Sequence, residues 1–263
     1  MDSMLCACVS WVMTQTYPAG QTRETLPRPH RNMLVRKLEG FGPLPEADRK
    51  LVARLADGGR QLPPRSDIIT EGQNPENVHL IVSGMACRYK LIDSGCRQIL
   101  AIFLPGDFCD LHVFILDHMD HSISTLTDCT VVDMPRSAVF QMLERPAIAK
   151  ALWWATLVDE AVLRERLVDI GRRPARERIS HLLCEIYVRM QAVGLVDGQS
   201  FDFRLTQTDI ADALGLTNVS VNKVIMELRR DGVLEASNAH ISVLKPDALQ
   251  AIGKFSDDYL HLT

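Results

Sequence analysis

Three polar side chains that can bond to base pairs, Asn218, Asn222 and Lys223, fall close together in the C-terminal part of the chain. An asparagine amide donates to and accepts from one adenine edge at the same time, and a lysine ammonium can donate to guanine O6 and N7. Asn218 and Asn222 are four residues apart, so they point the same way from a helix. Val219, beside Asn218, can contact a thymine methyl group. These four residues are predicted to form a base-reading face that contacts double-stranded DNA.

The segment 205–230 must position these side chains, and its pattern predicts two short helices joined by a tight turn. Thr206 can cap the first helix, and Asp209 three residues later completes a capping box. Gly215 suits a left-handed exit from that helix, and Thr217 can cap the second. The positions expected to face inward are apolar: Ile210, Ala213, Leu214, Val221, Val224, Ile225 and Leu228. A helix-turn-helix of this kind lays its second helix in the major groove.

Four polar residues border the base-reading face and are expected to hold phosphates, which fixes the register without choosing a sequence. They are Gln207, Thr208, Thr217 and Ser220. Further along, 233–235 and 240–244 are predicted to be short strands around Ser237-Asn238-Ala239, which would form a wing. A solvated helix in a small all-α domain is the alternative interpretation of the helical part.

A second informative stretch, EGQNPENVHLIVSGMACRYKLIDSGCRQILAIFLPGDF, covers residues 71–108. Its glycines, Gly72, Gly84, Gly95 and Gly106, separate short alternating runs, as turns separate the strands of a jelly roll. Asp93-Ser94-Gly95 is expected to be a hairpin turn between strands at 86–92 and 97–103. With the helix-turn-helix downstream, residues 33–245 resemble the Crp/Fnr superfamily of bacterial transcription regulators.

The resemblance implies an α+β fold with an N-terminal β-roll, similar to a cyclic-nucleotide-binding domain, then a long dimerisation helix and a C-terminal winged helix-turn-helix. The expected boundaries are 1–30 for a flexible N-terminal extension, 31–145 for the roll as sensor, 146–172 for the dimerisation helix and hinge, 173–245 for the winged domain and 246–263 for a C-terminal tail. The implied function is that of a sequence-specific DNA-binding transcription regulator, with RNA polymerase as a further partner.

The stretch 146–170 has Pro146 in its first turn and predicts a long helix. Ile148, Leu152, Ala155, Val162 and Ile170 approximate one apolar stripe, which Trp153, Leu157, Leu163 and Leu167 widen. A stripe this broad is expected to pack on the roll at one side and on a second copy at the other, giving a homodimer. The alternative is a single buried helix in a monomer. Gly171 and Pro174 are expected to interrupt the helix and form the hinge before a further helix at 175–190.

The roll lacks the residues by which the family's nucleotide-binding members hold cyclic AMP. In those members a Gly-Glu pair contacts the ribose and an Arg-Ser pair neutralises the phosphate. Aligned from Gly106, this chain has Asp110-Leu111 and His121-Ser122 at those places. Without the guanidinium, a buried phosphate loses its bidentate contact. We therefore expect an effector other than cyclic AMP, or none; its identity stays open.

The same stretch carries His112, Asp117, His118, Asp120 and His121. Their spacing matches no defined metal motif, so a solvated loop is favoured over a divalent cation site and no metal is predicted. An iron–sulfur cluster is not expected either, because the N-terminus offers only Cys6 and Cys8. The remaining cysteines are interpreted as core residues, with Cys184 as a candidate for oxidation. No cofactor is predicted.

Composition and charge agree with a globular protein but do not themselves indicate DNA: the 263 residues carry a formal net charge of −4, and 46% are apolar. Arginines cluster locally at Arg172, Arg173, Arg176 and Arg178 and again at Arg229 and Arg230, as a solvated face or a phosphate clamp. No apolar run is long enough to span a bilayer and no secretory signal is evident, so a cytoplasmic protein is expected.

Two other function classes share features with this chain. A signalling protein could use a cyclic-nucleotide-type roll without acting through DNA, but the complete helix-turn-helix argues against it. An enzyme is not predicted, because the chain shows no G-x-S-x-G, phosphate-loop or metalloprotease motif. Family members commonly place Glu after Arg or Val at the start of the recognition helix, and an Arg further on. Asn218, Val219 and Lys223 occupy those places here. The operator is therefore expected to differ from the family consensus, and neither target genes nor the sign of regulation follows from the sequence.

Overall fold

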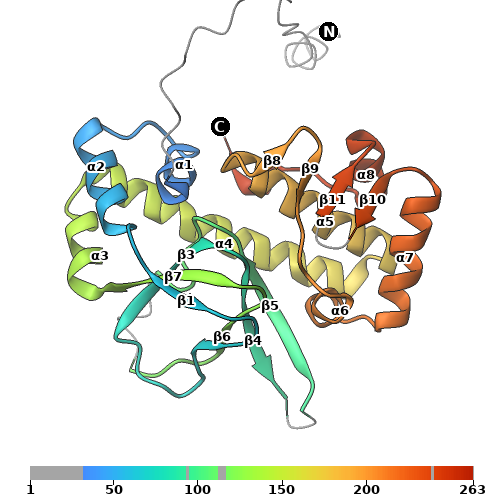
Figure 1. Ribbon diagram of the computed structural model, residues 1–263, viewed down its shortest axis with the longest axis horizontal. Coiled ribbons are helices and arrows are strands. Elements are labelled where there is room, and N and C mark those ends of the chain that lie inside the picture. The colour runs from blue at the N-terminus through green and yellow to red at the C-terminus, as the bar shows by residue number, and fades with distance from the viewer. Residues whose placement is uncertain (1–31, 93–94, 112–116, 238–239, 263) are drawn as a thin grey trace, which may run out of the picture. The chain divides into compact units, whose positions relative to one another are not determined.

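The computed structural model describes residues 32–92, 95–111, 117–237 and 240–262 (Figure 1). The predicted extension at 1–30, with Cys6 and Cys8, lies outside the described residues, as do His112 and the centres of the two predicted turns at Asp93-Ser94 and Asn238-Ala239. The α+β architecture predicted from the sequence is confirmed: a β-roll, a long helix and a winged helix-turn-helix follow one another along the chain.

Two short helices, α1 (Met33–Glu39) and α2 (Glu46–Leu55), precede the roll. The strands of the roll are β1 (Arg60–Leu62), β2 (Asp67–Ile69), β3 (Asn77–Ser83), β4 (Ala86–Leu91), β5 (Arg97–Phe103), β6 (Ser122–Thr125) and β7 (Cys129–Pro135). They form two antiparallel sheets, ordered β1-β7-β3 and β2-β6-β4-β5. The predicted hairpin is present, since β4 pairs with β5 from Ala86 opposite Phe103 to Leu91 opposite Arg97.

The core of the roll is built from the inward side chains of both sheets, among them Leu80, Ile81, Ile123 and Val131, each at most 1% exposed. Helix α3 (Arg136–Leu143) covers β3 and β7, which explains why β3 is buried over most of its length instead of alternating. Helix α3 also packs beside α2 and the long helix that follows (Figure 1).

The long helix α4 (Pro146–Arg172) has 27 residues and two contrasting faces. Ile148 and Leu152 are 0% and 1% exposed and pack in the core of the roll, whereas Trp153 and Leu167 are 69% and 67% exposed. The predicted sharing of the stripe Ile148, Leu152, Ala155, Val162 and Ile170 between the roll and a second copy needs correction. Its first four residues are buried within this chain, whereas Ile170 is 38% exposed. The exposed large apolar side chains of α4 are Trp153, Leu157, Leu163, Leu167, Val168 and Ile170.

The hinge also differs from the prediction. Helix α4 continues through Gly171, and the chain leaves the helix only at Arg173, whose backbone is extended. Pro174 then occupies the N-cap position of α5 (Ala175–Ala192). The physical reason is that proline disfavours helical geometry at the preceding residue, whereas a single glycine is tolerated inside a helix. Pro174 alone makes this break.

The winged domain follows α5. Its elements are β8 (Val196–Asp197), β9 (Ser200–Asp202), α6 (Gln207–Leu214), α7 (Asn218–Arg230), β10 (Leu234–Ser237) and β11 (His240–Val243). The predicted wing strands are confirmed as β10 and β11, which pair antiparallel, and two short strands that were not predicted extend the sheet in the order β10-β11-β9-β8. Side chains of the roll, such as Ile99, lie in the same buried apolar cluster as Leu214 of α6.

The C-terminal residues, predicted as a tail, form α8 (Pro246–Gly253) and a 3-10 turn, η2 (Asp258–Leu260). Leu249 and Leu260 are each 1% exposed. A Cβ on Gly253 would lie 2.7 Å from the backbone nitrogen of His181, so α8 approaches α5 at a distance that only glycine permits. Tyr259 of η2 donates to the carboxylate of Glu185 at 3.2 Å. These residues are therefore an integral part of the fold.

Candidate nucleic-acid interface

The two helices of the helix-turn-helix begin and end as their sequence predicts. Thr206 Oγ1 accepts from the amide of Asp209 at 3.1 Å, and the Asp209 carboxylate accepts from the amide of Thr206 at 3.0 Å, which is a complete capping box. Gly215 ends α6 with φ 61° and ψ 43°. Thr217 Oγ1 accepts from the amide of Ser220 at 3.2 Å and so caps α7. This local chemistry fixes the angle between the helices through a short turn.

The four residues of the base-reading face lie together on the outside of α7. Val219 is 78% exposed, and Asn218, Asn222 and Lys223 are exposed beside it. The opposite face of α7 is buried through Val221, Val224 and Leu228. Met226, for which the sequence pattern predicted no role, is 53% exposed one helical turn beyond Asn222. It extends the same face.

The residues predicted to hold phosphates lie against the base-reading face. Gln207 Nε2 donates to Asn222 Oδ1 at 3.4 Å, and Asn218 Nδ2 donates to Thr208 Oγ1 at 3.2 Å. Thr217 and Ser220 share a hydrogen bond of 2.9 Å between their hydroxyls, and Ser220 is half-buried. The start of α6 and the outer face of α7 therefore form one polar surface. A ligand that displaces these weak, exposed contacts can take over their donors and acceptors.

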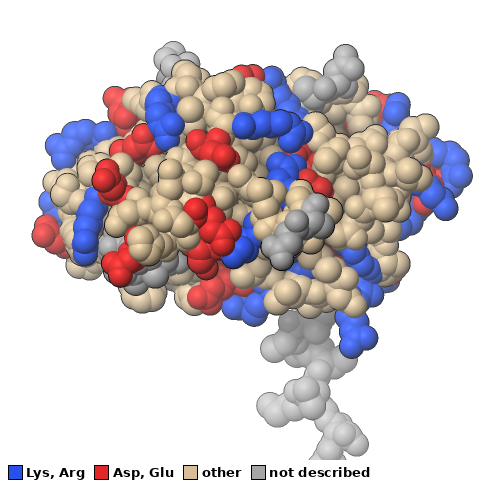
Figure 2. Space-filling view, turned by 90° about the horizontal axis from the view of Figure 1, so that it is seen from below, with Lys and Arg blue, Asp and Glu red and all other residues tan. Residues whose placement is uncertain are grey.

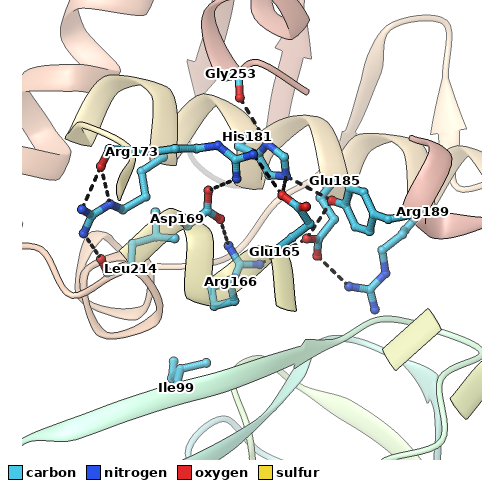
Figure 3. Close-up of polar contacts among 12 residues, drawn as sticks. Ile99, Glu165, Arg166, Asp169, Arg173, His181, Glu185, Arg189, Leu214 and Gly253 are labelled. Carbon is cyan, nitrogen blue, oxygen red and sulfur yellow. Dashed lines mark hydrogen bonds and ion pairs between the residues drawn. The ribbon is translucent and has the colours of Figure 1, made fainter. Parts of the chain in front are cut away.

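The arginines at the hinge are engaged within the protein. Arg173 donates to Asp169 at 2.7 Å and to Glu165 at 2.9 Å (Figure 3). Arg176 donates to Glu227 at 3.2 Å and to Asp231 at 2.7 Å.

Arg178 completes this set, because its guanidinium donates to the backbone carbonyls of Ile170, Arg173 and Leu214 at 3.2, 2.8 and 2.6 Å. It joins the ends of α4 and α6, whose last carbonyls need donors. Of the two interpretations left open by the sequence, neither a solvated face nor a phosphate clamp describes these three arginines. Acidic and basic side chains are intermingled over the face shown in Figure 2, so charge alone does not mark a DNA surface there.

In the roll, Asp110 and His121 contact each other; each belongs to one of the two residue pairs that differ from nucleotide-binding members. The carboxylate of Asp110, 4% exposed, lies 3.0 Å from His121 Nε2. It also accepts from Arg88 at 2.6 Å, and the Arg88 guanidinium stacks over Phe103 at 5.3 Å from the ring centroid. His121 Nδ1 lies 2.6 Å from Asp120. Leu111 packs against the apolar core. The charged groups of this region are therefore paired with one another.

The described residues offer no cluster of three or more His, Cys, Asp or Glu side chains that could hold a metal ion. Asp117 and His118 are exposed, and His112 lies outside the described residues. The cysteines Cys87, Cys109, Cys129 and Cys184 are buried as predicted, whereas Cys96 is exposed and is not a core residue. Burial raises the pKa of the Cys184 thiol to about 12 and that of Cys87 to about 11. These thiols are protonated and packed in the core, which is unfavourable for oxidation at Cys184.

Two segments of the chain match known protein families. Residues 59–146 match the cyclic nucleotide-binding domain family and residues 177–252 match the Crp-like helix-turn-helix domain family. The two domains occur in the order that the fold shows. The chain belongs to the Crp/Fnr family of transcription regulators. Its function is that of a DNA-binding transcription regulator of the Crp/Fnr type, so the interpretation as a signalling protein that does not act through DNA is not supported.

Individual members of the Crp/Fnr family are also similar to this chain. The nitrogen fixation regulation protein FixK of Azorhizobium caulinodans is 29% identical over 181 residues, which cover 68% of this chain and 72% of that protein. The transcriptional activator protein FnrL of Cereibacter sphaeroides is 29% identical over 195 residues, 73% of this chain and 77% of that protein. Among solved structures, FixK2 from Bradyrhizobium japonicum has a TM-score of 0.67 at 25% identity, covering 76% of this chain and 98% of that chain.

None of the described helices combines the length and the apolar character that crossing a bilayer requires.

Proposed function

We propose that the protein acts as a homodimer joined along α4. One face of this helix carries large apolar side chains that the described part of the chain leaves exposed: Trp153, Leu157, Leu163 and Leu167. A tryptophan at 69% exposure and a leucine at 67% on a single helix form a stripe that normally meets a partner. A second copy of α4 supplies a matching stripe in a two-fold arrangement. This exposed stripe is the observation that carries the proposal.

In this dimer, each α7 enters a major groove, and the two grooves lie one helical turn apart, about 34 Å, on one side of a pseudo-palindromic operator. Asn218, Val219, Asn222 and Lys223 contact base edges, since they are exposed together on α7. Gln207, Thr208, Thr217 and Ser220 hold the flanking phosphates. Met226 adds an apolar contact at the end of this face.

The effector of this regulator is not cyclic AMP, or the protein works without one. Support comes from the roll, where Asp110 bonds to both Arg88 and His121. A cyclic nucleotide would have to break these buried contacts and would gain no guanidinium at His121 for its phosphate. A roll whose charged groups are already paired is consistent with a regulator that has no effector and whose activity is set by its abundance.

We further propose that the protein works in the cytoplasm, has no enzymatic activity and activates transcription by contacting RNA polymerase. Activation is suggested by FnrL, which is named as a transcriptional activator, and enters here only by similarity.

Selection of bound sequences from random DNA by the wild-type protein tests the proposal. The expected product is a pseudo-palindrome whose half-sites are centred about 10 base pairs, or a multiple, apart. Recovery of single, unpaired half-sites would contradict the dimer, and recovery of no sequence preference would contradict operator recognition.

A further inference from the structure

A strand of the roll bonds directly to the helix that supports α7. The guanidinium of Arg97, the first residue of β5, donates through Nη2 to Asp209 at 2.6 Å and through Nε to Asp212 at 2.8 Å. The next residue, Gln98, donates from its side-chain amide to the backbone carbonyl of Asp212 at 2.7 Å. Both acceptors lie on α6, more than a hundred positions further along the chain. We call these contacts of Arg97 and Gln98 with α6 the roll clamp.

The roll clamp is shielded from water. The Arg97 side chain is 17% exposed, and the side chains of Asp209 and Asp212 are 1% and 23% exposed. Charge-assisted hydrogen bonds with a forked arginine are directional and stronger when water is excluded. Arg65 adds a second cation, with its guanidinium 3.8 Å from Asp209.

Asp209 has a second role, because its carboxylate also closes the capping box of α6 by accepting from the amide and hydroxyl of Thr206. The residue that sets the start of α6 is thus the residue held by the roll. Around this polar contact, Ile99 and Cys87 of the roll share an apolar cluster with Ile210 and Leu214 of α6. A rotation of α6 would have to break both the ionic and the apolar parts together.

The clamp leaves the DNA-contacting residues open. Gln207 and Thr208 are exposed at the start of α6, and Asn218, Asn222 and Lys223 are exposed on α7. In α6, Asp209 and Asp212 face the roll, whereas Gln207 and Thr208 contact the side chains of α7. The roll therefore holds α6 by one side while the other side is free to meet a phosphate backbone.

We infer that Arg97 is a positioning residue for DNA recognition: by binding Asp209 and Asp212 it fixes the orientation of α6 and α7 relative to the roll, and so fixes the half-site spacing that the dimer accepts. The inference rests on the proposed homodimer that binds two half-sites. Orienting the helices before binding lowers the free-energy cost of ordering them in the complex. It also weakens binding to operators whose half-sites require another orientation.

A simpler role for Arg97 would be neutralisation of two carboxylates near the DNA phosphates. The two roles predict opposite results for Asp212→Asn. If only charge matters, removing a carboxylate tightens binding to every operator and leaves the spacing preference intact. If Arg97 positions α6, the same substitution removes half of the clamp and broadens the range of spacings that are bound.

The experiment measures affinities of the full-length protein for the selected operator and for variants with half-sites one or two base pairs closer or farther apart. We expect the wild type to discriminate strongly between the best spacing and its neighbours. Arg97→Ala and Asp212→Asn should each reduce this discrimination severalfold, and the double variant should be no broader than Arg97→Ala alone, because both act through one contact. Arg97→Lys keeps the positive charge but loses the bidentate guanidinium. Its discrimination between spacings should therefore lie between those of the wild type and Arg97→Ala.

Arg60→Ala is the matched control, because Arg60 is a roll arginine whose partner, Asp133, lies in the same roll. Its spacing preference should equal that of the wild type. A spacing preference unchanged in both Arg97→Ala and Asp212→Asn would overturn the inference. So would tighter binding of Arg97→Ala at the best spacing, since that would make the clamp inhibitory.

A second measurement needs no DNA. Amide hydrogen exchange in α6 of the free protein should become faster in Arg97→Ala and Asp212→Asn, while exchange in the paired strands β3 and β7 stays as in the wild type. Unchanged exchange in α6 would contradict the clamp even if the wild type bound DNA as proposed. Conversely, the wild type could bind no specific DNA while the two variants still exchange faster than the wild type in α6. That result would refute the proposed function and leave the clamp as a structural contact without the positioning role.

Discussion

Arg166 of α4 and Glu185 of α5 form an ion pair of 3.3 Å whose side chains are only 6% and 1% exposed. Each has further partners: Arg166 donates to Asp169 at 3.0 Å, and Glu185 accepts from Arg189 at 3.0 Å (Figure 3). Arg189 in turn donates to Asp107 of the roll at 2.6 Å. A buried chain of charges therefore runs from the roll through α5 to the last turns of α4.

Substitution of Glu185 by Ala is expected to destabilise the protein by about 3–5 kcal/mol, because it leaves two buried arginines without a carboxylate between them. Urea denaturation followed by circular dichroism measures this loss. Lys50→Ala is the control, since Lys50 is 74% exposed and pairs with Glu46 at 3.5 Å on the surface. It should cost less than about 1 kcal/mol. Equal losses of stability for the two substitutions would mean that the buried charges contribute no more to stability than a surface ion pair.

Stability should fall on acidification, in part through His181. Burial lowers the pKa of this imidazole from its ordinary value of 6.5. Below pH 6.5 the unfolded chain binds the proton more readily than the folded protein, so the free energy of unfolding decreases as the pH falls toward the folded pKa. One proton contributes at most about 1.4 kcal/mol per pH unit.

Denaturation curves at a series of pH values test this expectation. His181→Gln should show a shallower dependence than the wild type, and a residual slope should remain because burial also lowers the pKa of His79. His118→Gln, at an exposed position, is the control and should retain the wild-type slope. An unchanged slope in His181→Gln would exclude this histidine as a source of the pH dependence.

The exposed stripe of α4 can be tested by charge. Leu157→Glu and Leu167→Glu should convert the protein to a monomer in sedimentation at micromolar concentration, because each places a carboxylate in an apolar interface. Leu244→Glu replaces a leucine that is 41% exposed outside α4 and should leave the assembly unchanged. A wild-type protein that sediments as a monomer under these conditions would rule out the dimer.

Cyclic AMP and cyclic GMP are not expected to bind tightly, because Asp110 is already bonded to Arg88 and His121. Titration calorimetry with each nucleotide should give no saturable heat. Submicromolar affinity accompanied by stronger DNA binding would show that other residues take the place of the missing anchors.

Single substitutions separate residues that choose bases from residues that hold phosphates. Asn218→Ala and Lys223→Ala should each lose about 1–3 kcal/mol at the specific operator and relax the preference at one base pair per half-site. Gln207→Ala should weaken all sequences alike. Selections on random DNA with each variant provide the comparison. The same preferred motif for Asn218→Ala, Lys223→Ala and the wild type would show that this face of α7 does not choose the bases.

Features that depend on neighbours in the chain were predictable from the sequence. The capping box of Thr206 and Asp209, the left-handed Gly215 and the β4–β5 hairpin all follow from residues a few positions apart, and all are present. The order of roll, long helix and winged domain followed from the resemblance of two segments to one family.

Features that depend on distant partners were not predictable. The periodicity of α4 identified its apolar residues, but not that Leu152 packs in the roll while Trp153 faces outward, since a stripe on a helix does not reveal what covers it. Arg178 sits among hinge arginines in the sequence, yet it binds the carbonyl of Leu214, 36 positions away. The contact of Arg97 with Asp209 could not be predicted, because no local sequence pattern links a strand of the roll to α6.

The charged contact between α4 and α5 also affects how the hinge responds to temperature. Separating Arg166 from Glu185, whose side chains are 6% and 1% exposed, would bring both ionic groups into contact with water. Apolar exposure is what gives unfolding its large positive heat capacity, whereas polar exposure lowers it. The ionic part of such an opening therefore lowers its heat-capacity change, so the free energy of opening this contact curves less with temperature than the free energy of melting the apolar cores.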